Sequence, residues 1–280
     1  MTRHSHHLEP LEPRLLLSGS AVDGDFTGDG KADLFWHNTR TGENILWEMS
    51  GKTVVQESSV TRLRNTDWKL VGTGDFTGDG KIDLLWRNTT DGRNSVWEMD
   101  GANVVASYSL RAKTNQDWQI TGVGDLTGDG KDDVIWRNER SYRLTVWEMD
   151  GVAYQSQIEL KRLRNPNWQV AAVVDMTGDG KDDLYLHHIN DGRNALWEMN
   201  DTTWVGNTAL KHIRHTAWQV GTVADYTGDG KADIVWRHAN QNINAVWNMD
   251  DTTFNGSSGI NGFREDGWEI AGSILGLWEA

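Results

Sequence analysis

Short runs of alternating apolar and polar residues follow one another along the chain, and the whole pattern returns every fifty residues. In residues 68–117 the runs are WKLVGTGDF, DLLWRN, NSVWEMD and VVASYSL, which have the alternation and the aromatic and β-branched content of strands. No segment sustains the 3.6-residue period of an amphipathic helix. The pattern therefore predicts an all-β protein with four short strands in each repeat.

The second and third strands of each repeat are predicted to form a β-hairpin. In residues 68–117 the turn signal between them is Asp91-Gly92, and a two-residue turn there places Trp86 directly opposite Trp97. A directly opposed aromatic pair on one sheet face contributes roughly 0.2 to 1 kcal/mol relative to alanines. The same register pairs the corresponding residues of the other repeats: Trp36 with Trp47, Trp136 with Trp147, Leu186 with Trp197, and Trp236 with Trp247.

Several series of residues keep the fifty-residue period without insertion or deletion. The series are Asp25, Asp75, Asp125, Asp175 and Asp225; Trp47, Trp97, Trp147, Trp197 and Trp247; and Trp68, Trp118, Trp168, Trp218 and Trp268. Four strands in a unit of this length are typical of a propeller blade. We predict a β-propeller of five four-stranded blades over residues 18–267, with a linear β-solenoid as the less favoured alternative.

The two ends of the chain depart from the repeat. Residues 268–280 begin like a sixth copy at Trp268 but omit the acidic loop, so we expect them to form a strand or hairpin that closes or caps the ring. A sixth blade cut short is the alternative. Residues 1–17 are expected to be a disordered tail, and the stretch LEPRLLLSG resembles the LEPR-XLL motif found near the start of many large bacterial surface or exported proteins.

Composition excludes several classes of function. The chain has no cysteine, which rules out disulfides, thiolate metal sites and a cysteine nucleophile. Its net charge of −14 disfavours a nucleic-acid partner, because phosphate binding needs clustered lysine and arginine. The longest apolar run near the start is Leu15–Leu17, so no export signal is visible and no membrane insertion is expected. We expect a monomer.

The acidic loop DFTGDGKAD, residues 25–33, has the spacing of a calcium loop. Calcium takes six to eight oxygen ligands, and D-x-[DN]-x-[DN]-G opens the EF-hand loop. In the first copy, positions 1, 3, 5, 7 and 9 are Asp25, Thr27, Asp29, the carbonyl of Lys31, and Asp33. The other copies supply Asp75, Thr77, Asp79, Lys81 and Asp83; Asp125, Thr127, Asp129, Lys131 and Asp133; Asp175, Thr177, Asp179, Lys181 and Asp183; and Asp225, Thr227, Asp229, Lys231 and Asp233.

Three carboxylates within nine residues repel one another, and a divalent cation removes that repulsion. We therefore expect up to five bound Ca²⁺ ions. Magnesium is disfavoured because it demands octahedral geometry and retains its water. The metal-free alternative is an Asp-Gly turn capped by its own side chains.

The segment DFTGDGKIDLLWRN, followed by WEMDG, resembles the FG-GAP-like or VCBS repeat of bacterial and integrin-type propellers, and the likeness covers residues 20 to about 250. The resemblance implies nine-residue calcium loops in which the aspartate at position 9 replaces the later EF-hand glutamate. Threonine at position 3 departs from the usual Asn or Asp, which implies reduced affinity.

The tryptophans that open each repeat have two interpretations. Trp68, Trp118, Trp168, Trp218 and Trp268 would be platforms for sugar rings, with neighbouring Arg and Asn as hydrogen-bond donors, or would pack between blades; packing is favoured. Three arginines follow the strand tryptophans and are expected to form surface ion pairs with glutamates or a polar rim. They are Arg87, Arg137 and Arg237, and the glutamates are Glu98 and Glu148.

These observations favour a calcium-stabilised, non-enzymatic propeller that acts as a binding or adhesion module outside the cell or on a bacterial surface, with an unknown protein or glycan as partner. A carbohydrate-binding lectin using the connector tryptophans is the first alternative. A propeller lyase or hydrolase is the second, disfavoured because no set of acids and histidines convincingly breaks the fifty-residue symmetry.

Overall fold

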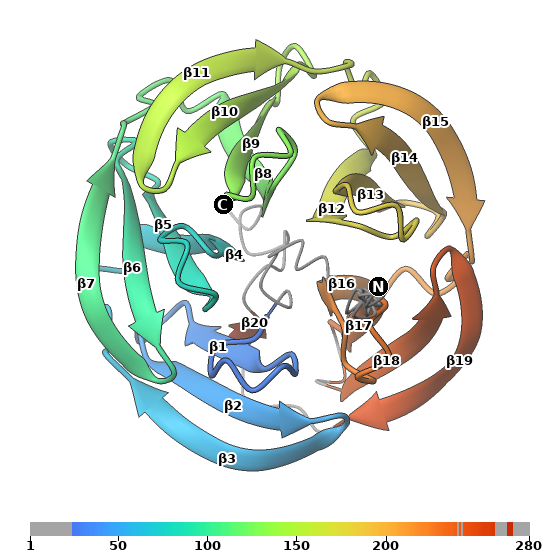
Figure 1. Ribbon diagram of the computed structural model, residues 1–280, viewed down its shortest axis with the longest axis horizontal. Helices are drawn as coiled ribbons and strands as arrows, with labels where there is room; N and C mark the ends of the chain where they lie inside the picture. The colour runs from blue at the N-terminus through green and yellow to red at the C-terminus, as the bar shows by residue number, and fades with distance from the viewer. Residues whose placement is uncertain (1–23, 240, 242, 261–267, 271–280) are drawn as a thin grey trace, which may run out of the picture.

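A computed structural model describes residues 24–239, 241, 243–260 and 268–270. These residues form five four-stranded antiparallel sheets arranged as blades around a central axis (Figure 1). The predicted all-β propeller with five four-stranded blades is confirmed. The predicted tail at 1–17 and residues 271–280 lie outside the described residues.

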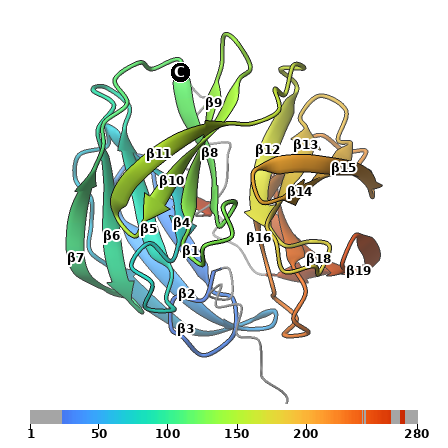
Figure 2. The same ribbon diagram turned by 45° about the horizontal axis from the view of Figure 1, so that its top comes forward.

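Each blade runs from an innermost strand near the axis to an outermost strand at the rim (Figures 1 and 2). Blade 1 contains β20 (Trp268–Ile270), β1 (Leu34–Asn38), β2 (Asn44–Ser50) and β3 (Thr53–Val60). Blade 2 contains β4 (Trp68–Gly74), β5 (Asp83–Asn88), β6 (Asn94–Asp100) and β7 (Asn103–Leu110). Blade 3 contains β8 (Trp118–Gly124), β9 (Asp133–Asn138), β10 (Leu144–Asp150) and β11 (Ala153–Glu159). Blade 4 contains β12 (Trp168–Val174), β13 (Asp183–His188), β14 (Asn194–Asn200) and β15 (Thr203–Leu210). Blade 5 contains β16 (Trp218–Ala224), β17 (Asp233–His238), β18 (Ile243–Asp250) and β19 (Thr253–Ile260).

Blade 1 joins the two ends of the chain. Strand β20 pairs antiparallel with β1, with Trp36 opposite Ile270 and Asn38 opposite Trp268. One C-terminal strand therefore completes a blade whose other three strands come from the N-terminal part of the chain. Residues 268–270 belong to blade 1, and the pairing removes the free edge that β1 would otherwise expose.

The predicted hairpin register is wrong. Trp86 pairs with Ser95, and Trp97 pairs with Leu84. The turn contains four residues instead of two: Asn88 N–H donates to the Arg93 carbonyl at 2.8 Å, and Gly92 N–H donates to the Asn88 carbonyl at 2.9 Å. The longer turn shifts the pairing by two positions, which keeps every side chain on its expected face.

The tryptophans expected to oppose one another directly are therefore diagonal neighbours on one face. Their ring centroids are 5.1 Å apart for Trp36–Trp47, 5.0 Å for Trp86–Trp97, 4.6 Å for Trp136–Trp147 and 4.9 Å for Trp236–Trp247. In blade 4, Leu184 faces Trp197 and Leu186 faces Ala195. The aromatic contact survives the register change because diagonal neighbours remain within reach of large rings.

The predicted surface ion pairs are wrong for Arg87 and Arg137, since both side chains are fully buried. The Arg87 guanidinium donates to the Lys113 carbonyl of the next connector at 2.9 Å and lies 4.9 Å from the ring centroid of Trp136 in the next blade. Arg237 lies over Trp36 at 5.2 Å, joining blade 5 to blade 1. These arginines connect neighbouring blades instead of forming a polar rim.

The apolar cores lie between neighbouring blades. One core brings Phe35 and Leu46 of blade 1 against Leu84 and Trp86 of blade 2. Four strand tryptophans, Trp36, Trp86, Trp136 and Trp236, are at most 1% exposed and fill the wedge between blades. Among the described residues there is no helix long and apolar enough to cross a membrane.

Candidate functional site

Each acidic loop connects the innermost strand of a blade to the second strand. In blade 2 the loop is organised by Asp75, whose Oδ1 accepts hydrogen bonds from Gly78 N–H at 2.7 Å and Asp79 N–H at 3.1 Å. Its Oδ2 accepts from Gly80 N–H at 2.9 Å. Gly80 has a φ of +82°, a backbone conformation that favours glycine. In the other loops the first aspartate accepts the same bonds from both glycine N–H groups.

The aspartate at position 9 is buried beneath the loop. Asp83 Oδ2 accepts from Phe76 N–H at 3.1 Å, and Asp83 Oδ1 accepts from Met99 N–H at 3.0 Å. Burial, together with the charges of Asp75 and Asp79, raises the pKa of Asp83 to about 7, against the lowering effect of the hydrogen bond from Met99 N–H. The pKa values of the equivalent aspartates are raised by burial in the same way: Asp33 to about 6, Asp133 to about 7, Asp183 to about 6, and Asp233 upward.

The loop lysine directs its charge away from this buried carboxylate. Lys81 Nζ lies 2.7 Å from Asp100 Oδ1, at the end of β6. Lys131 and Lys231 make the corresponding pairs with Asp150 and Asp250. In blade 1, where Ser50 replaces the partner aspartate, Lys31 pairs with Asp29 of its own loop at 3.4 Å.

The residues of the loop fit a hard divalent cation by donor type. Positions 1, 5 and 9 are carboxylates, position 3 is a hydroxyl and position 7 offers a carbonyl. The buried Thr77 hydroxyl has no hydrogen-bond partner within the described part of the chain. The carboxylates meanwhile cap backbone N–H groups, and over the described ranges no three His, Asp or Glu side chains form a metal-ligating group. Asp75 Oδ2 and Asp83 Oδ1 each accept one of these N–H groups, and a carboxylate oxygen has two lone pairs, so each of these two oxygens keeps one for a metal.

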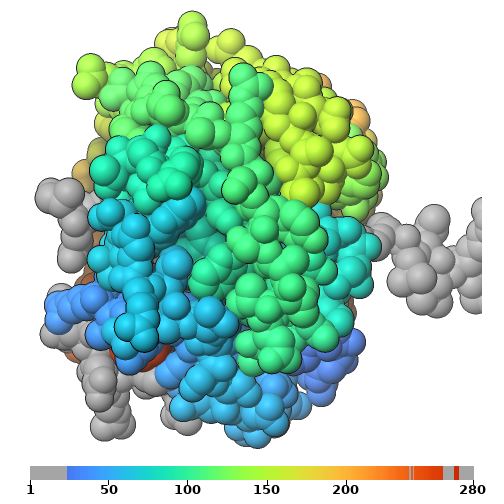
Figure 3. All heavy atoms as spheres, turned by 90° about the vertical axis from the view of Figure 1, so that its left-hand side faces the viewer, coloured from blue at the N-terminus to red at the C-terminus, as the bar shows by residue number. Residues whose placement is uncertain are grey.

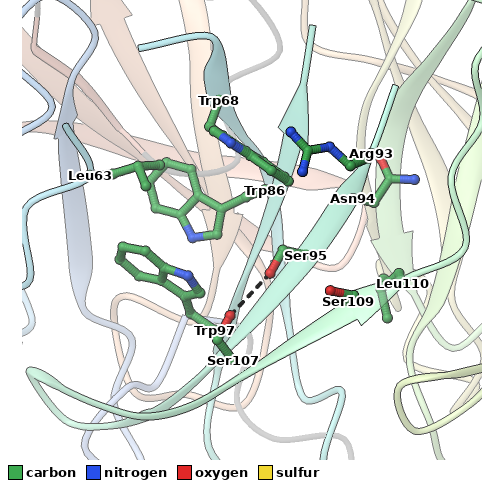
Figure 4. Close-up of a pocket in the computed structure, with 10 residues that line it drawn as sticks. All are labelled: Leu63, Trp68, Trp86, Arg93, Asn94, Ser95, Trp97, Ser107, Ser109 and Leu110. Carbon is green, nitrogen blue, oxygen red and sulfur yellow. Dashed lines mark hydrogen bonds between the residues drawn. The ribbon is translucent and has the colours of Figure 1, made fainter. Parts of the chain in front are cut away.

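The connector tryptophans all begin an innermost strand, and two of them, Trp68 and Trp168, line similar pockets. Trp68 lines a cavity of about 300 Å³ together with Leu63, Arg93 and Trp97 (Figure 4). Trp168 lines a cavity of about 360 Å³ in blade 4. Its lining residues correspond one to one with those of blade 2 at a shift of one hundred residues, including Leu163, Arg193 and Trp197.

The remaining connector tryptophans are placed differently. Trp118 is covered by the ammonium of Lys113, 4.3 Å from its ring centroid. Trp218 packs against His238 with ring centroids 5.0 Å apart, a contact that Trp168 also makes with His188. Trp268 is buried in the core between blades 5 and 1. Packing therefore accounts for the buried Trp268, while Trp68 and Trp168 line cavities and remain candidates for ligand contact.

Lys113 and Trp97 are site residues that the sequence interpretation missed. The sequence does contain a signal for Lys113. At the same position of the connector, other repeats carry the apolar residues Leu63, Leu163 and Ile213, so the charge of Lys113 is an exception.

Five four-stranded blades, each with an acidic loop after its innermost strand, define a repeat β-propeller. The chain belongs to the FG-GAP-like repeat family, whose model matches residues 25–86, 75–136, 125–186 and 175–236. The matches tile the chain in steps of fifty residues, so the resemblance read from the loop and strand motifs is confirmed. A comparison with curated proteins found no match.

Solved structures share the fold at low sequence identity. The chain is 11% identical to a chain from a Nidogen/Laminin complex, with a TM-score of 0.51, covering 85% of this chain and 98% of that one. For an auxiliary nutrient binding protein from Bacteroides thetaiotaomicron the identity is 9%, the TM-score 0.50 and the coverage 85% and 57%. For the Photorhabdus luminescens Tc holotoxin pore the values are 16%, 0.46, and 90% of this chain but only 12% of that chain. The first two likenesses concern the fold alone.

Proposed function

We propose that the protein is a calcium-binding, non-enzymatic propeller that serves as a binding or adhesion module outside the cell or on a bacterial surface. The observation that carries the calcium assignment is the buried aspartate at position 9, present in all five loops beside two further aspartates. Burial and neighbouring negative charge both disfavour an ionised carboxylate there unless a cation neutralises it. The residues at positions 1, 3, 5, 7 and 9 would hold the ion.

The binding role is supported by the matched cavities in blades 2 and 4. Each is lined by tryptophan, arginine and asparagine, and no Asp, Glu or His lines either of these two cavities. A hydrolase or lyase would need an acid or base within hydrogen-bond reach of the substrate. The lining therefore suits recognition better than catalysis.

The calcium assignment is tested by thermal unfolding of the chain with calcium and with a chelator. A ligand that binds only the folded state at a hundred times its dissociation constant stabilises it by about 2.7 kcal/mol per site. We expect calcium to raise the melting temperature by roughly 5 °C or more, and magnesium to raise it much less. Identical melting curves with calcium and with chelator would remove the metal from the proposal.

Carbohydrate binding is a second candidate, supported by the position of two connector tryptophans. Trp68 and Trp168 each lie in a cavity beside an arginine and an asparagine, the arrangement expected for ring stacking with flanking hydrogen bonds. A glycan array in calcium tests it. A specific signal lost in Trp68→Leu but kept in Trp218→Leu, whose side chain packs on His238, would support a lectin.

A further inference from the structure

Lysines from the connectors lie over the tryptophans of three blades. Lys113 covers the rings of blade 3, Lys161 lies over Trp197 in blade 4 at 5.2 Å, and Lys211 lies over Trp247 in blade 5 at 5.7 Å. A cation within about 6 Å of an indole centroid is attracted to the negative face of the ring. In these three blades a connector lysine therefore places an ammonium group beside a hairpin tryptophan.

Blade 3 shows the most complete version of this arrangement. Lys113 Nζ is 4.3 Å from the ring centroid of Trp118, 4.7 Å from that of Trp136 and 4.8 Å from that of Trp147. Gln157 Oε1 accepts a hydrogen bond from the same ammonium at 3.3 Å. Three rings and one amide oxygen thus surround a single cation of the chain itself.

Blade 2 has the same three tryptophans but lacks the lysine. Thr61 and Leu63 occupy the two connector positions that carry cations in other blades. Figure 4 shows Trp68, Trp86 and Trp97 around the cavity of about 300 Å³, which we call the blade 2 pocket. Ser107 replaces the longer Gln157 at its wall, which leaves that side of the pocket open.

The charges around the blade 2 pocket leave room for an external cation. Arg93 lies over the Trp68 ring at 5.5 Å, and its charge is balanced by Asp91, whose Oδ2 is 2.8 Å from Arg93 Nε. Within the described ranges, no lysine or arginine lies over the ring of Trp86 or Trp97. The chain as a whole carries a net charge of −14, which attracts cations.

We propose that the blade 2 pocket binds an alkylammonium group from outside the chain, held against the half-buried Trp68 and Trp97 with the buried Trp86 as the third lining ring, in the way that Lys113 is held in blade 3. The proposal rests on the proposed binding function and names its ligand class. The group belongs to a methylated lysine side chain or to a choline-type molecule, which share this chemistry. Blade 2 would then carry the ligand-binding site. Its residues are coloured cyan to green in the space-filling view (Figure 3).

Blade 4 provides an internal comparison. Leu186 replaces the third tryptophan there, and Lys161 already lies over Trp197 and Trp204. Its cavity should bind the same ligands much more weakly, since one ring is absent and a cation is already present.

The test measures binding of choline by calorimetry, beside its neutral isostere in which carbon replaces the quaternary nitrogen. The two probes have the same shape, so the difference reports the charge. We expect choline to bind roughly tenfold more tightly or better. Equal binding of both probes would overturn the proposal, because it would show an apolar pocket with no preference for a cation.

Two variants test whether choline binds in the blade 2 pocket. Leu63→Lys reproduces the blade 3 connector and should abolish choline binding by supplying the cation internally. Lys113→Leu removes the ammonium group from between the three tryptophans of blade 3 and should create a second choline-binding site in each chain. Unchanged binding in Leu63→Lys, with the melting temperature of the parent chain, would overturn the assignment to blade 2.

A peptide carrying one trimethylated lysine distinguishes the source of the ligand. Tighter binding of the peptide than of choline indicates a protein side chain, and the reverse indicates a small molecule or headgroup. If neither choline nor the trimethyllysine peptide binds but a glycan binds through Trp68, the ammonium proposal fails while the proposed binding function stands. If calcium leaves the melting temperature unchanged, only the metal assignment fails.

Discussion

The aspartate at position 9 of each loop is a buried carboxylate with opposing influences on its charge. Asp83 accepts hydrogen bonds from Phe76 N–H of the loop and from Met99 N–H of β6, which favour the ionised form. Burial, together with Asp75 and Asp79, favours the protonated form and raises the pKa to about 7. The protonation of this carboxyl group therefore changes near neutral pH, where the proposed cation would compete with the proton.

The stability of the chelated protein should increase as the solution is acidified from neutral pH. The pKa of Asp83 is about 7 in the folded chain, against about 3.9 when unfolded, so the folded state binds the proton more tightly. Its free energy of unfolding should rise as the pH falls from about 7 toward 4, and Asp133 contributes in the same direction. Urea unfolding in chelator measures this trend.

Calcium should flatten or reverse the same trend, since the ion favours the ionised carboxylate and competes with protons. A pH profile that is identical with calcium and with chelator would contradict the assignment of these aspartates as ligands.

Arg87 shows how a single buried cation joins two blades. Its guanidinium donates to the carbonyls of Gly92 and Lys113, and it lies over the Trp136 ring. Burial lowers the pKa of Arg87 to about 10, so the group stays charged at neutral pH. The surface position expected from its strongly polar side chain was wrong because backbone carbonyls of the next connector satisfy its donors.

Replacing Arg87 with methionine should therefore destabilise the propeller. The variant keeps the apolar stem but leaves buried carbonyls without donors, at a cost of about 2 kcal/mol or more. Arg93→Met is the matched control, because Arg93 is exposed and solvent screens its ion pair with Asp91, which therefore contributes little to stability. Urea midpoints that fall equally in both variants would contradict the inter-blade role.

The conformation of the four-residue hairpin turn of blade 2 depends on the connector to the next blade, which packs against it. Gly92, with a φ of +77°, closes the turn, and its carbonyl accepts a hydrogen bond from Lys113 N–H at 2.9 Å. The connector to the next blade therefore lies directly on the turn. In blade 3 the corresponding residue is Tyr142, with a φ of 55°, so the left-handed conformation itself does not require glycine.

Gly92→Ala should cost more stability than Gly80→Ala. Both glycines have positive φ, which costs about 1 to 2 kcal/mol for alanine. A Cβ at Gly92 would also overlap the Lys113 carbonyl oxygen, whereas a Cβ at Gly80 meets no atom within 4 Å. Chemical denaturation in chelator compares the two, and equal losses would show that the connector moves aside without cost.

The ring as a whole is closed by one short strand. Trp268 and Ile270 of β20 join Trp36 of blade 1 and Ala224 and Val235 of blade 5 in one core. The closing strand therefore seals the boundary between the first and last blades, in addition to completing a sheet.

A chain ending at Gly267 should lose cooperative folding. It would expose the edge of β1 and open the core between blades 5 and 1. We expect a broader unfolding transition, a melting temperature lower by roughly 10 °C or more, and concentration-dependent association in size-exclusion chromatography. Removal of residues 1–17 serves as the control and should change none of these. A truncated chain that melts like the parent would show that β20 is dispensable.

The fifty-residue repeat by itself determined the strands, the blade number and the places of the acidic loops. These properties follow from local periodicity, and every copy carries the same signals. The family assignment followed from the same motifs. The oxygen-rich spacing of the loops also predicted calcium, a prediction that metal-dependent unfolding will test.

Only the tertiary structure decided the hairpin register, the burial of Arg87 and the presence of the blade 2 pocket. The register depends on a turn that Asn88 caps with its side chain and the next connector contacts through its backbone. The pocket depends on which connector residue, Leu63 or Lys113, lies against the tryptophans. Such contacts join residues that the repeat keeps apart in sequence, and they exist only once consecutive blades pack together.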